Sequence, residues 1–277
     1  MSSYGERLDQ ICAARGTLCA GVDPHPGLLA AWGLENSAAG LERFSRSLVE
    51  ALGEQLAVIK PQSAFFESFG SAGIAVLERL LADIRDAGAL SILDVKRGDI
   101  GSTMSAYAQA YLADGAPLAA DAITVSPYLG FGSLQPAFDQ ALRYGRGVYV
   151  LARTSNPEGG QVQLAQTDGL AVAQQIVDQA TAANESSGQS AIGLVVGGTH
   201  QSLGCDVSAF DGSILVPGIG AQGGRMSDLP TLFGAAFTRV LPMVGRDLLG
   251  AGPNQNALRD KATQLLESVA EATQHDS

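Results

Sequence analysis

The stretch ILDVKRGDIGST, residues 92–103, begins as an apolar segment and then places four charged residues within six positions. These residues are Asp94, Lys96, Arg97 and Asp99. Charged side chains are seldom buried in an apolar strand unless they have partners. Alternate residues of a strand point to the same side. Asp94 and Lys96 are therefore predicted to share one face at the carboxyl end of a strand.

Seven other short apolar runs resemble the beginning of this stretch. Each run is nearly continuous in apolar residues, which is typical of parallel strands that are covered on both faces. The eight predicted strands span residues 17–23, 56–61, 89–96, 121–127, 147–154, 191–198, 213–220 and 239–246.

Helical patterns separate many of these strands. Apolar residues recur at helical spacing in the segments 41–52, 104–112 and 258–269. Strands that alternate with helices eight times predict an α/β protein, a (β/α)8 TIM barrel that forms a single domain over residues 1–277. A doubly wound open sheet is the alternative. We also expect a short N-terminal helix, a connection after the seventh strand that is short for a full helix, and a frayed tail after about residue 270.

The polar segment 154–169 is long for a connection between a strand and a helix. Connections of this length often cover a functional site. We therefore expect a mobile loop over the site here.

Composition argues against several classes of function. The formal net charge of −11 makes nucleic acid or an anionic membrane an improbable main partner. The three cysteines are far apart, so no disulfide framework is expected. The chain has no run of about 18 apolar residues that could span a membrane, and its first residues lack an apolar signal stretch. We therefore expect a cytoplasmic protein.

Charged residues also end the first two predicted strands, at Asp23 and Lys60. In a TIM barrel the carboxyl ends of the strands meet at one rim, where active sites are built. Asp23, Lys60, Asp94 and Lys96 are therefore expected to converge there, with Asp99 close by. A structural network of ion pairs is the alternative, although buried ion pairs are weak stabilisers.

Glycine-rich turns follow the last two predicted strands, in VPGIGAQGG (216–224) and MVGRD (243–247). The loops after strands seven and eight are the usual phosphate site of such barrels, because their backbone N–H groups face the anion. Arg246 can add a charged contact and Gln222 an amide. A phosphorylated ligand is therefore expected.

Together these motifs resemble the orotidine 5'-phosphate decarboxylase family, in its longer, second type. The similarity extends from about residue 17 to residue 247. One departure is RGDIGST, since many members carry DIP at the corresponding place. The motifs that carry the resemblance are DVKRGDIGST, VIKP with Lys60, GVDP with Asp23, PGIGAQGG and VGRD.

The resemblance implies a role for individual residues. Lys60, Asp94, Lys96 and Asp99 match an alternating catalytic array, in which Lys96 is the proton donor. Asp99 matches the member that the other subunit of a homodimer supplies. The matching substrate contacts are Asp23 and Lys60 to the ribose, Ile100 and Thr103 beside Asp99, Ser155 and Pro217 at the pyrimidine ring, and Gln222, Gly245 and Arg246 at the phosphate.

The implied reaction is the loss of CO₂ from C6 of orotidine 5'-monophosphate, which gives uridine 5'-monophosphate in pyrimidine synthesis. It is difficult because the C6 carbanion has no adjacent electron sink. A fixed ammonium group, here Lys96, can stabilise that charge and then protonate it. The resemblance implies no cofactor and no metal. His25, His200 and His275 show no paired ligand spacing.

Two other functions share part of this pattern. A Mg²⁺-dependent sugar-phosphate aldolase or decarboxylase of the same barrel suprafamily shares the DxKxxD motif and the phosphate loops. Such enzymes offer a carboxylate to the metal where this chain has Lys60. A non-catalytic nucleotide-binding barrel would be favoured by the loss of a member of the array, and all four members are present.

Overall fold

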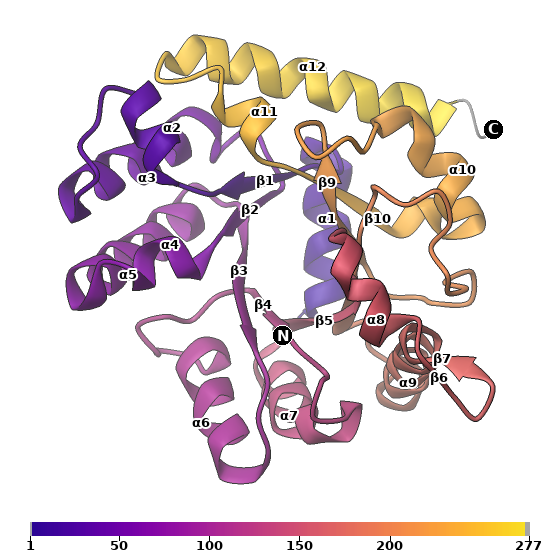
Figure 1. Ribbon diagram of the computed structural model, residues 1–277. Helices are drawn as coiled ribbons and strands as arrows, with labels where there is room; N and C mark the ends of the chain where they lie inside the picture. Colours follow the sequence, from indigo (N-terminus) through magenta and orange to yellow (C-terminus); the bar gives the residue numbers. More distant parts are fainter. Residues whose placement is uncertain (1, 275–277) are drawn as a thin grey trace.

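The computed structural model describes residues 2–274, and its centre is a closed barrel of eight parallel strands (Figure 1). Neighbouring strands pair in the order β1-β10-β9-β8-β5-β4-β3-β2, so the last strand closes onto the first. The predicted TIM barrel is thereby confirmed, and the open sheet is wrong. The barrel strands are β1 (Cys19–Val22), β2 (Val58–Pro61), β3 (Leu90–Arg97), β4 (Ala122–Val125), β5 (Gly147–Arg153), β8 (Ile192–Val196), β9 (Ile214–Ile219) and β10 (Val240–Val244).

Helices cover the outside of the barrel, and apolar side chains fill both sides of the strands. Cys19, Val58, Ile92, Tyr149 and Leu215 belong to a cluster inside the barrel. A larger cluster joins the outer strand faces to the helices, as the continuous apolar runs require. The longer helices are α1 (Tyr4–Arg15), α3 (Ala38–Leu52), α5 (Gly70–Asp86), α6 (Gly101–Leu112), α7 (Gln135–Tyr144), α9 (Val172–Ser187) and α12 (Gln255–Gln274).

The alternation of strand and helix is interrupted after the sixth barrel strand. Residues 197–213, which join β8 to β9, are all described and contain no helix. The predicted eightfold alternation of strand and helix therefore fails at the sixth unit. The connection after β9 contains no full-length helix, as expected, but only α10 (Leu229–Phe233) and flanking turns of 3-10 helix.

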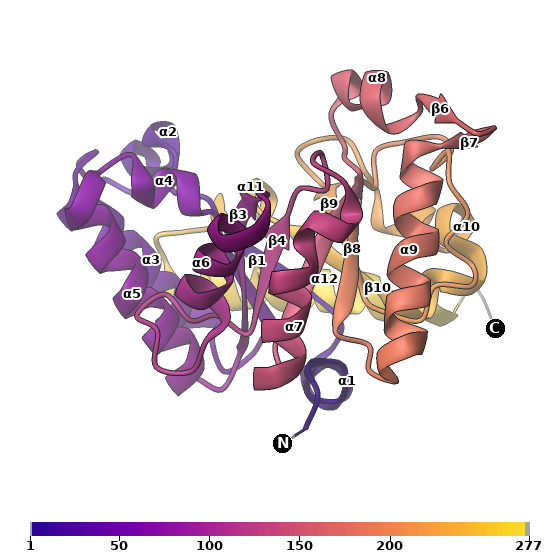
Figure 2. The same cartoon turned by 90° about the horizontal axis from the view of Figure 1, so that it is seen from below.

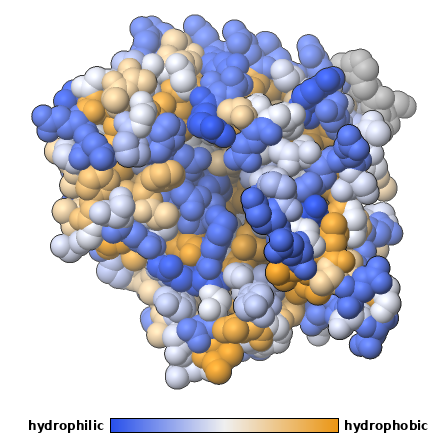
Figure 3. Space-filling model, viewed as in Figure 1, coloured by the Kyte–Doolittle hydropathy of each residue, from blue (hydrophilic) through white to orange (hydrophobic). Residues whose placement is uncertain are grey.

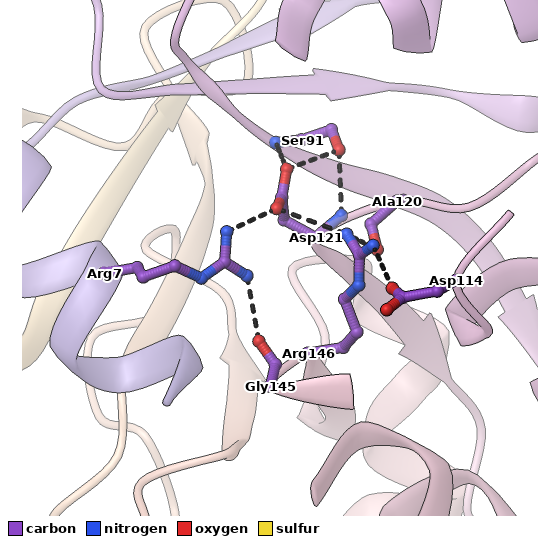
Figure 4. A network of polar contacts seen from close by, with 7 residues as sticks. All are labelled: Arg7, Ser91, Asp114, Ala120, Asp121, Gly145 and Arg146. Atoms are coloured by element: carbon purple, nitrogen blue, oxygen red, sulfur yellow. Dashed lines mark hydrogen bonds and ion pairs between the residues drawn. The ribbon is translucent and has the colours of Figure 1, made fainter. Parts of the chain in front are cut away.

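Helix α1 closes the amino end of the barrel, opposite the mouth (Figure 2). Arg7 donates a hydrogen bond to Asp121 at 2.7 Å and another to the carbonyl of Gly145 at 2.9 Å. Asp121 also accepts from the backbone of Ser91 at 3.0 Å and pairs with Arg146 at 3.4 Å (Figure 4). These contacts join α1 to the starts of three strands.

The segment predicted to be a loop over the site carries short elements above the mouth (Figure 2). We call residues 154–171 the lid. It contains a 3-10 turn (Pro157–Gly159), α8 (Gly160–Gln163) and a small hairpin of β6 (Gln166–Thr167) and β7 (Leu170–Ala171).

At the carboxyl end, α12 continues to Gln274. Residues 271–274 are therefore helical, whereas a frayed tail was expected there. The rest of that expected tail, residues 275–277 with His275, lies outside the described residues. None of the helices in residues 2–274 combines the length and apolar character needed to cross a membrane.

Candidate active site

Asp94 is the centre of the charged network at the barrel mouth. Its Oδ2 lies 2.8 Å from Nζ of Lys60, and its Oδ1 lies 2.6 Å from Nζ of Lys96. Nζ of Lys60 is also 4.0 Å from Oδ1 of Asp23. The structure therefore brings Asp23, Lys60, Asp94 and Lys96 together at the carboxyl ends of β1, β2 and β3, as predicted from the sequence.

Burial and charge control the ionisation of this network. Burial by itself raises the pKa of Asp94, but the charges and hydrogen bonds of Lys60 and Lys96 outweigh it and hold that pKa well below its usual range. Burial likewise lowers the pKa of Lys60, and the carboxylates of Asp94 and Asp23 outweigh it and raise that pKa above its usual value. Asp94 and Lys60 are therefore both charged at neutral pH.

Lys96 differs from Lys60 in its exposure and its backbone. The Lys60 side chain is 4% exposed, whereas that of Lys96 is 46% exposed. Lys96 has a φ of 43°, a left-handed conformation that strains a residue other than glycine. The pairing of β3 with β4 shifts between Leu93 and Arg97, so this strand end is irregular. The irregularity directs Lys96 into the mouth and ties its ammonium to Asp94.

Arg97, the fourth charge of the opening stretch, belongs to a separate contact. Its guanidinium lies 2.8 Å from Glu67 and stacks over the ring of Tyr107 at 5.4 Å from the centroid. Arg97 therefore joins the end of β3 to α4 (Ser63–Glu67) and α6 rather than to the network.

A cavity of about 740 Å³ opens directly above the network. Figure 3 shows a hollow near the middle of this face, bordered by hydrophilic and hydrophobic residues. Its wall is apolar at Leu151, Val195, Leu215 and Met243. The predicted site residues that line it are Asp23, Lys60, Asp94, Lys96, Ser155, Pro217 and Gln222.

Five predicted site residues lie outside this cavity, and three of them, Asp99, Ile100 and Thr103, follow β3. Asp99 follows β3, and its Oδ1 accepts a hydrogen bond from the backbone of Ile100 at 2.8 Å. Ile100 is 62% exposed, and Thr103 is exposed in the first turn of α6. Gly101 has a φ of 51°, a conformation that proline cannot adopt. Within a single chain, Asp99, Ile100 and Thr103 therefore do not contribute to the cavity at the barrel mouth.

The two glycine-rich loops lie beside the cavity, as predicted. In the loop after β9, Gly218 and Gly220 have φ values of 101° and 79°. Such conformations need glycine. Gln222 of this loop accepts a hydrogen bond from Ser155 at 3.2 Å, which links the loop to the lid.

The loop after β10 places its two predicted residues next to Asp23. Gly245 precedes α11 (Arg246–Leu249), and a Cβ at Gly245 would lie 3.1 Å from Oδ2 of Asp23. The exposed Arg246 lines a second cavity of about 320 Å³, which Asp23 and Gln62 also line. Arg246 is therefore at the edge of the main site rather than within it.

Two further polar residues contact the network and were not predicted from the sequence. Thr124, at the end of β4, donates to Oδ1 of Asp94 at 2.7 Å and accepts from the backbone N–H of Lys96 at 3.0 Å. Gln62 accepts from Lys60 at 3.2 Å. Both could have been found from strand alternation: Gln62 lies two residues after Lys60, and Thr124 interrupts an apolar strand.

Asp23 retains an unused acceptor. Its Oδ1 is buried and has no hydrogen-bond partner among residues 2–274. A buried acceptor without a partner is costly. The Asp23 side chain as a whole is 24% exposed and lines the cavity, so its carboxylate can accept a hydrogen bond from a ligand hydroxyl group there.

The class of protein follows from these features: a TIM-barrel enzyme whose site combines alternating lysines and aspartates with glycine-rich loops after the last two strands. The profile of the Orotidine 5'-phosphate decarboxylase / HUMPS family matches residues 16–260. The chain belongs to this family.

Relatives and solved structures agree with this assignment. The chain is 54% identical over 268 residues to an orotidine 5'-phosphate decarboxylase of Salinispora arenicola, with 96% of each chain covered. It is 51% identical to one of Streptomyces coelicolor, covering 98% of this chain and 99% of that one. A putative orotidine 5'-phosphate decarboxylase of Streptomyces avermitilis superposes with a TM-score of 0.92 at 52% identity, covering 98% and 96%.

Proposed function

We propose that this chain is a carboxy-lyase that converts orotidine 5'-monophosphate to uridine 5'-monophosphate and CO₂ in pyrimidine synthesis. The family and the names of the full-length relatives support this substrate. The observation that carries the mechanism is the Lys60–Asp94–Lys96 network at the cavity, with contacts of 2.8 and 2.6 Å.

In the proposed reaction, Lys96 acts on C6 of the pyrimidine. Its side chain is about half exposed and lines the cavity, and its ammonium group is held by Asp94. The C–C bond to the carboxylate breaks and leaves its electron pair on C6, and the fixed positive charge stabilises that pair. Lys96 then transfers a proton to C6. The products are uridine 5'-monophosphate and CO₂, and no electrons are gained or lost.

Asp94 has two proposed roles in this scheme. It orients Lys96, and its ionised carboxylate faces the carboxylate that departs as CO₂. The repulsion between the two groups is relieved as the bond breaks. Lys60 and Thr124 hold Asp94 in place through contacts of 2.8 and 2.7 Å.

The rest of the nucleotide would lie across the mouth. The Asp23 carboxylate, one oxygen of which has no hydrogen-bond partner among residues 2–274, suits a ribose hydroxyl, with Lys60 beside it. Ser155 and Pro217 line the cavity where the ring would lie. The phosphate would be bound by Gln222, Gly245 and Arg246. Because the phosphate is remote from C6, its binding energy can drive closure and water exclusion.

Catalysis is expected to need no metal ion. Lys60 stands 2.8 Å from Asp94, and its charge would repel a cation bound to that carboxylate. Decarboxylation of orotidine 5'-monophosphate, followed by its ultraviolet absorbance, should therefore proceed at the same rate after exhaustive chelation. Loss of activity on chelation with recovery on adding Mg²⁺ would favour the aldolase-like alternative. Absence of any turnover would favour the non-catalytic barrel.

Arg246 offers a separate test of the phosphate site. Replacing it with alanine should lower kcat/KM for orotidine 5'-monophosphate about a hundredfold or more, the size of a lost charged hydrogen bond. Turnover of orotidine, which lacks the phosphate, should change far less. Arg225→Ala is a matched control, because Arg225 is exposed in the neighbouring loop and pairs with Asp228. Equal losses on both substrates would place Arg246 outside the phosphate site.

A homodimer with shared sites is supported by the surface beside β3 and β4. Ile100, Tyr128 and Leu129 are 62%, 79% and 53% exposed, in the loops after these two strands. The loops touch each other, since the backbone of Ser126 donates to the carbonyl of Arg97 at 2.8 Å. A second subunit would cover these apolar side chains. Each subunit would be one barrel domain, because β1 and β10 pair.

A further inference from the structure

Arg153, at the end of β5, is a buried arginine without an acidic partner. It is 7% exposed, and no carboxylate of residues 2–274 lies within ion-pair distance of it. Its Nε has no hydrogen-bond partner among these residues. Buried charges are normally paired, so an arginine in this position requires a specific explanation.

Three neutral acceptors hold the guanidinium group of Arg153. Its Nη1 donates to Oε1 of Gln163 at 3.1 Å and to the carbonyl of Thr154 at 3.3 Å. Its Nη2 lies 3.5 Å from Nδ1 of His200, and Nε2 of His200 lies 2.8 Å from the same carbonyl. A carbonyl can only accept, so Nε2 carries the hydrogen and Nδ1 is left to accept from Arg153. Arg153 thus joins the strand end, the lid and the loop after β8.

Gln163 connects this arginine to the cavity. Its Oε1 also accepts from the backbone N–H of Thr154 at 3.0 Å, and its Nε2 donates to the hydroxyl of Thr154 at 2.7 Å. Gln163 and Thr154 both line the cavity above the charged network. The lid backbone packs directly on this contact, since a Cβ at Gly159 would lie 2.7 Å from Oε1 of Gln163.

The loop that replaces the sixth helix forms the base on which the lid rests. A Cβ at Gly204 would lie 2.6 Å from Cδ2 of Leu164, and one at Gly197 would lie 2.6 Å from Cα of Ser155. The hydroxyl of Thr199 donates to the carbonyl of Ser155 at 3.0 Å. A residue larger than glycine at position 197 would push the lid backbone away, whereas one at position 204 would displace the end of the Leu164 side chain. The loop after β8 and the lid are therefore shaped to each other.

We propose that Arg153 is a positioning residue for the reaction: through Gln163 it anchors the lid on the loop after β8 and so keeps the lid closed over the substrate. Arg153 lines neither the main cavity nor the cavity beside Arg246, so it acts through the lid and not by contact with the substrate. Because arginine carries a positive charge in proteins, the anchor is a charged one. The expected change in KM rests on the proposed decarboxylation, whereas the anchoring of the lid does not depend on that reaction.

The kinetic test compares Arg153→Met and Gln163→Ala with the unaltered enzyme. Each should raise KM for orotidine 5'-monophosphate about tenfold to a hundredfold, as for one lost hydrogen bond to a charged group, and change kcat less than about threefold. Arg153→Lys should give a KM between those of Arg153→Met and the unaltered enzyme, because an ammonium reaches fewer of the acceptors. Arg143→Met removes the same charge from an exposed site, where its ring partner is Tyr144, and should change neither constant. Unchanged KM in both lid variants would overturn the proposal.

Hydrogen exchange in the free protein tests the anchor without reference to activity. Residues 154–171 should exchange at least about tenfold faster in both variants, with the barrel strands unchanged. The double variant should match the more affected single variant, because both changes break one contact. If Arg153→Met loosens the whole barrel, Gln163→Ala decides: faster exchange confined to the lid supports the anchor, and unchanged exchange overturns it. A chain that lacks decarboxylase activity would still give this result.

Discussion

Replacing Lys96 with alanine should lower the rate of decarboxylation by about four orders of magnitude or more, because one side chain supplies both charge stabilisation and the proton. The protein should fold normally. The Lys96 side chain is 46% exposed, and Asp94 would keep Lys60 at 2.8 Å and Thr124 at 2.7 Å. Steady-state kinetics and a thermal unfolding curve would check the two halves of this expectation.

Lys96→Arg separates the proton donor from the ion pair. Arginine keeps the positive charge beside Asp94 but does not give up a proton at neutral pH. If Lys96 is the acid, both variants should be inactive. If Lys96 serves the ion pair alone, arginine should restore most of the activity. If the Lys96→Ala variant retained more than a few per cent of the original rate, Lys96 would be excluded as the proton donor.

The core of the charged network was predictable because it follows from strand geometry. Asp94 and Lys96 are two residues apart on one strand, and Asp23 and Lys60 end the neighbouring strands. Strand alternation and the common rim of a parallel barrel are enough to bring such residues together. The eight apolar runs predicted the barrel for the same reason, since strands covered on both faces leave a continuous pattern.

Other features depend on contacts between distant loops, which local patterns do not record. Residues 197–213, which contain no helix, pack against the lid at Gly197 and Gly204. Arg153 continues an apolar strand, and its partners Gln163 and His200 are 10 and 47 residues away. The left-handed backbone conformation of Lys96 likewise could not be predicted from the sequence, because lysine does not favour a positive φ.

Asp99 shows a further limit of reasoning from one chain. Its position just after β3 suggested a place near Asp94 and Lys96, yet it does not line the cavity of its own chain. It lies instead between β3 and the exposed Ile100, beside the apolar loops after β3 and β4. This arrangement suits a residue that reaches the site of a second subunit.

Mixing two inactive proteins should therefore restore activity if Asp99 completes the partner's site. Lys96→Ala and Asp99→Ala would be combined, dissociated and reassociated. In a two-fold dimer each contact occurs twice, so a mixed dimer has one site with both defects and one with none. Random pairing makes about half of the dimers mixed, so the recovered activity should approach roughly a quarter of the original.

The same experiment has an opposite outcome if Asp99 acts within its own chain. Every site would then carry one lesion, and mixing would restore nothing. Mass measurement of intact dimers must show that subunits have exchanged, and each variant dissociated and reassociated alone provides the baseline. A confirmed mixed dimer without activity would remove the shared site. Recovery near a quarter would assign Lys96 and Asp99 of one active site to different subunits.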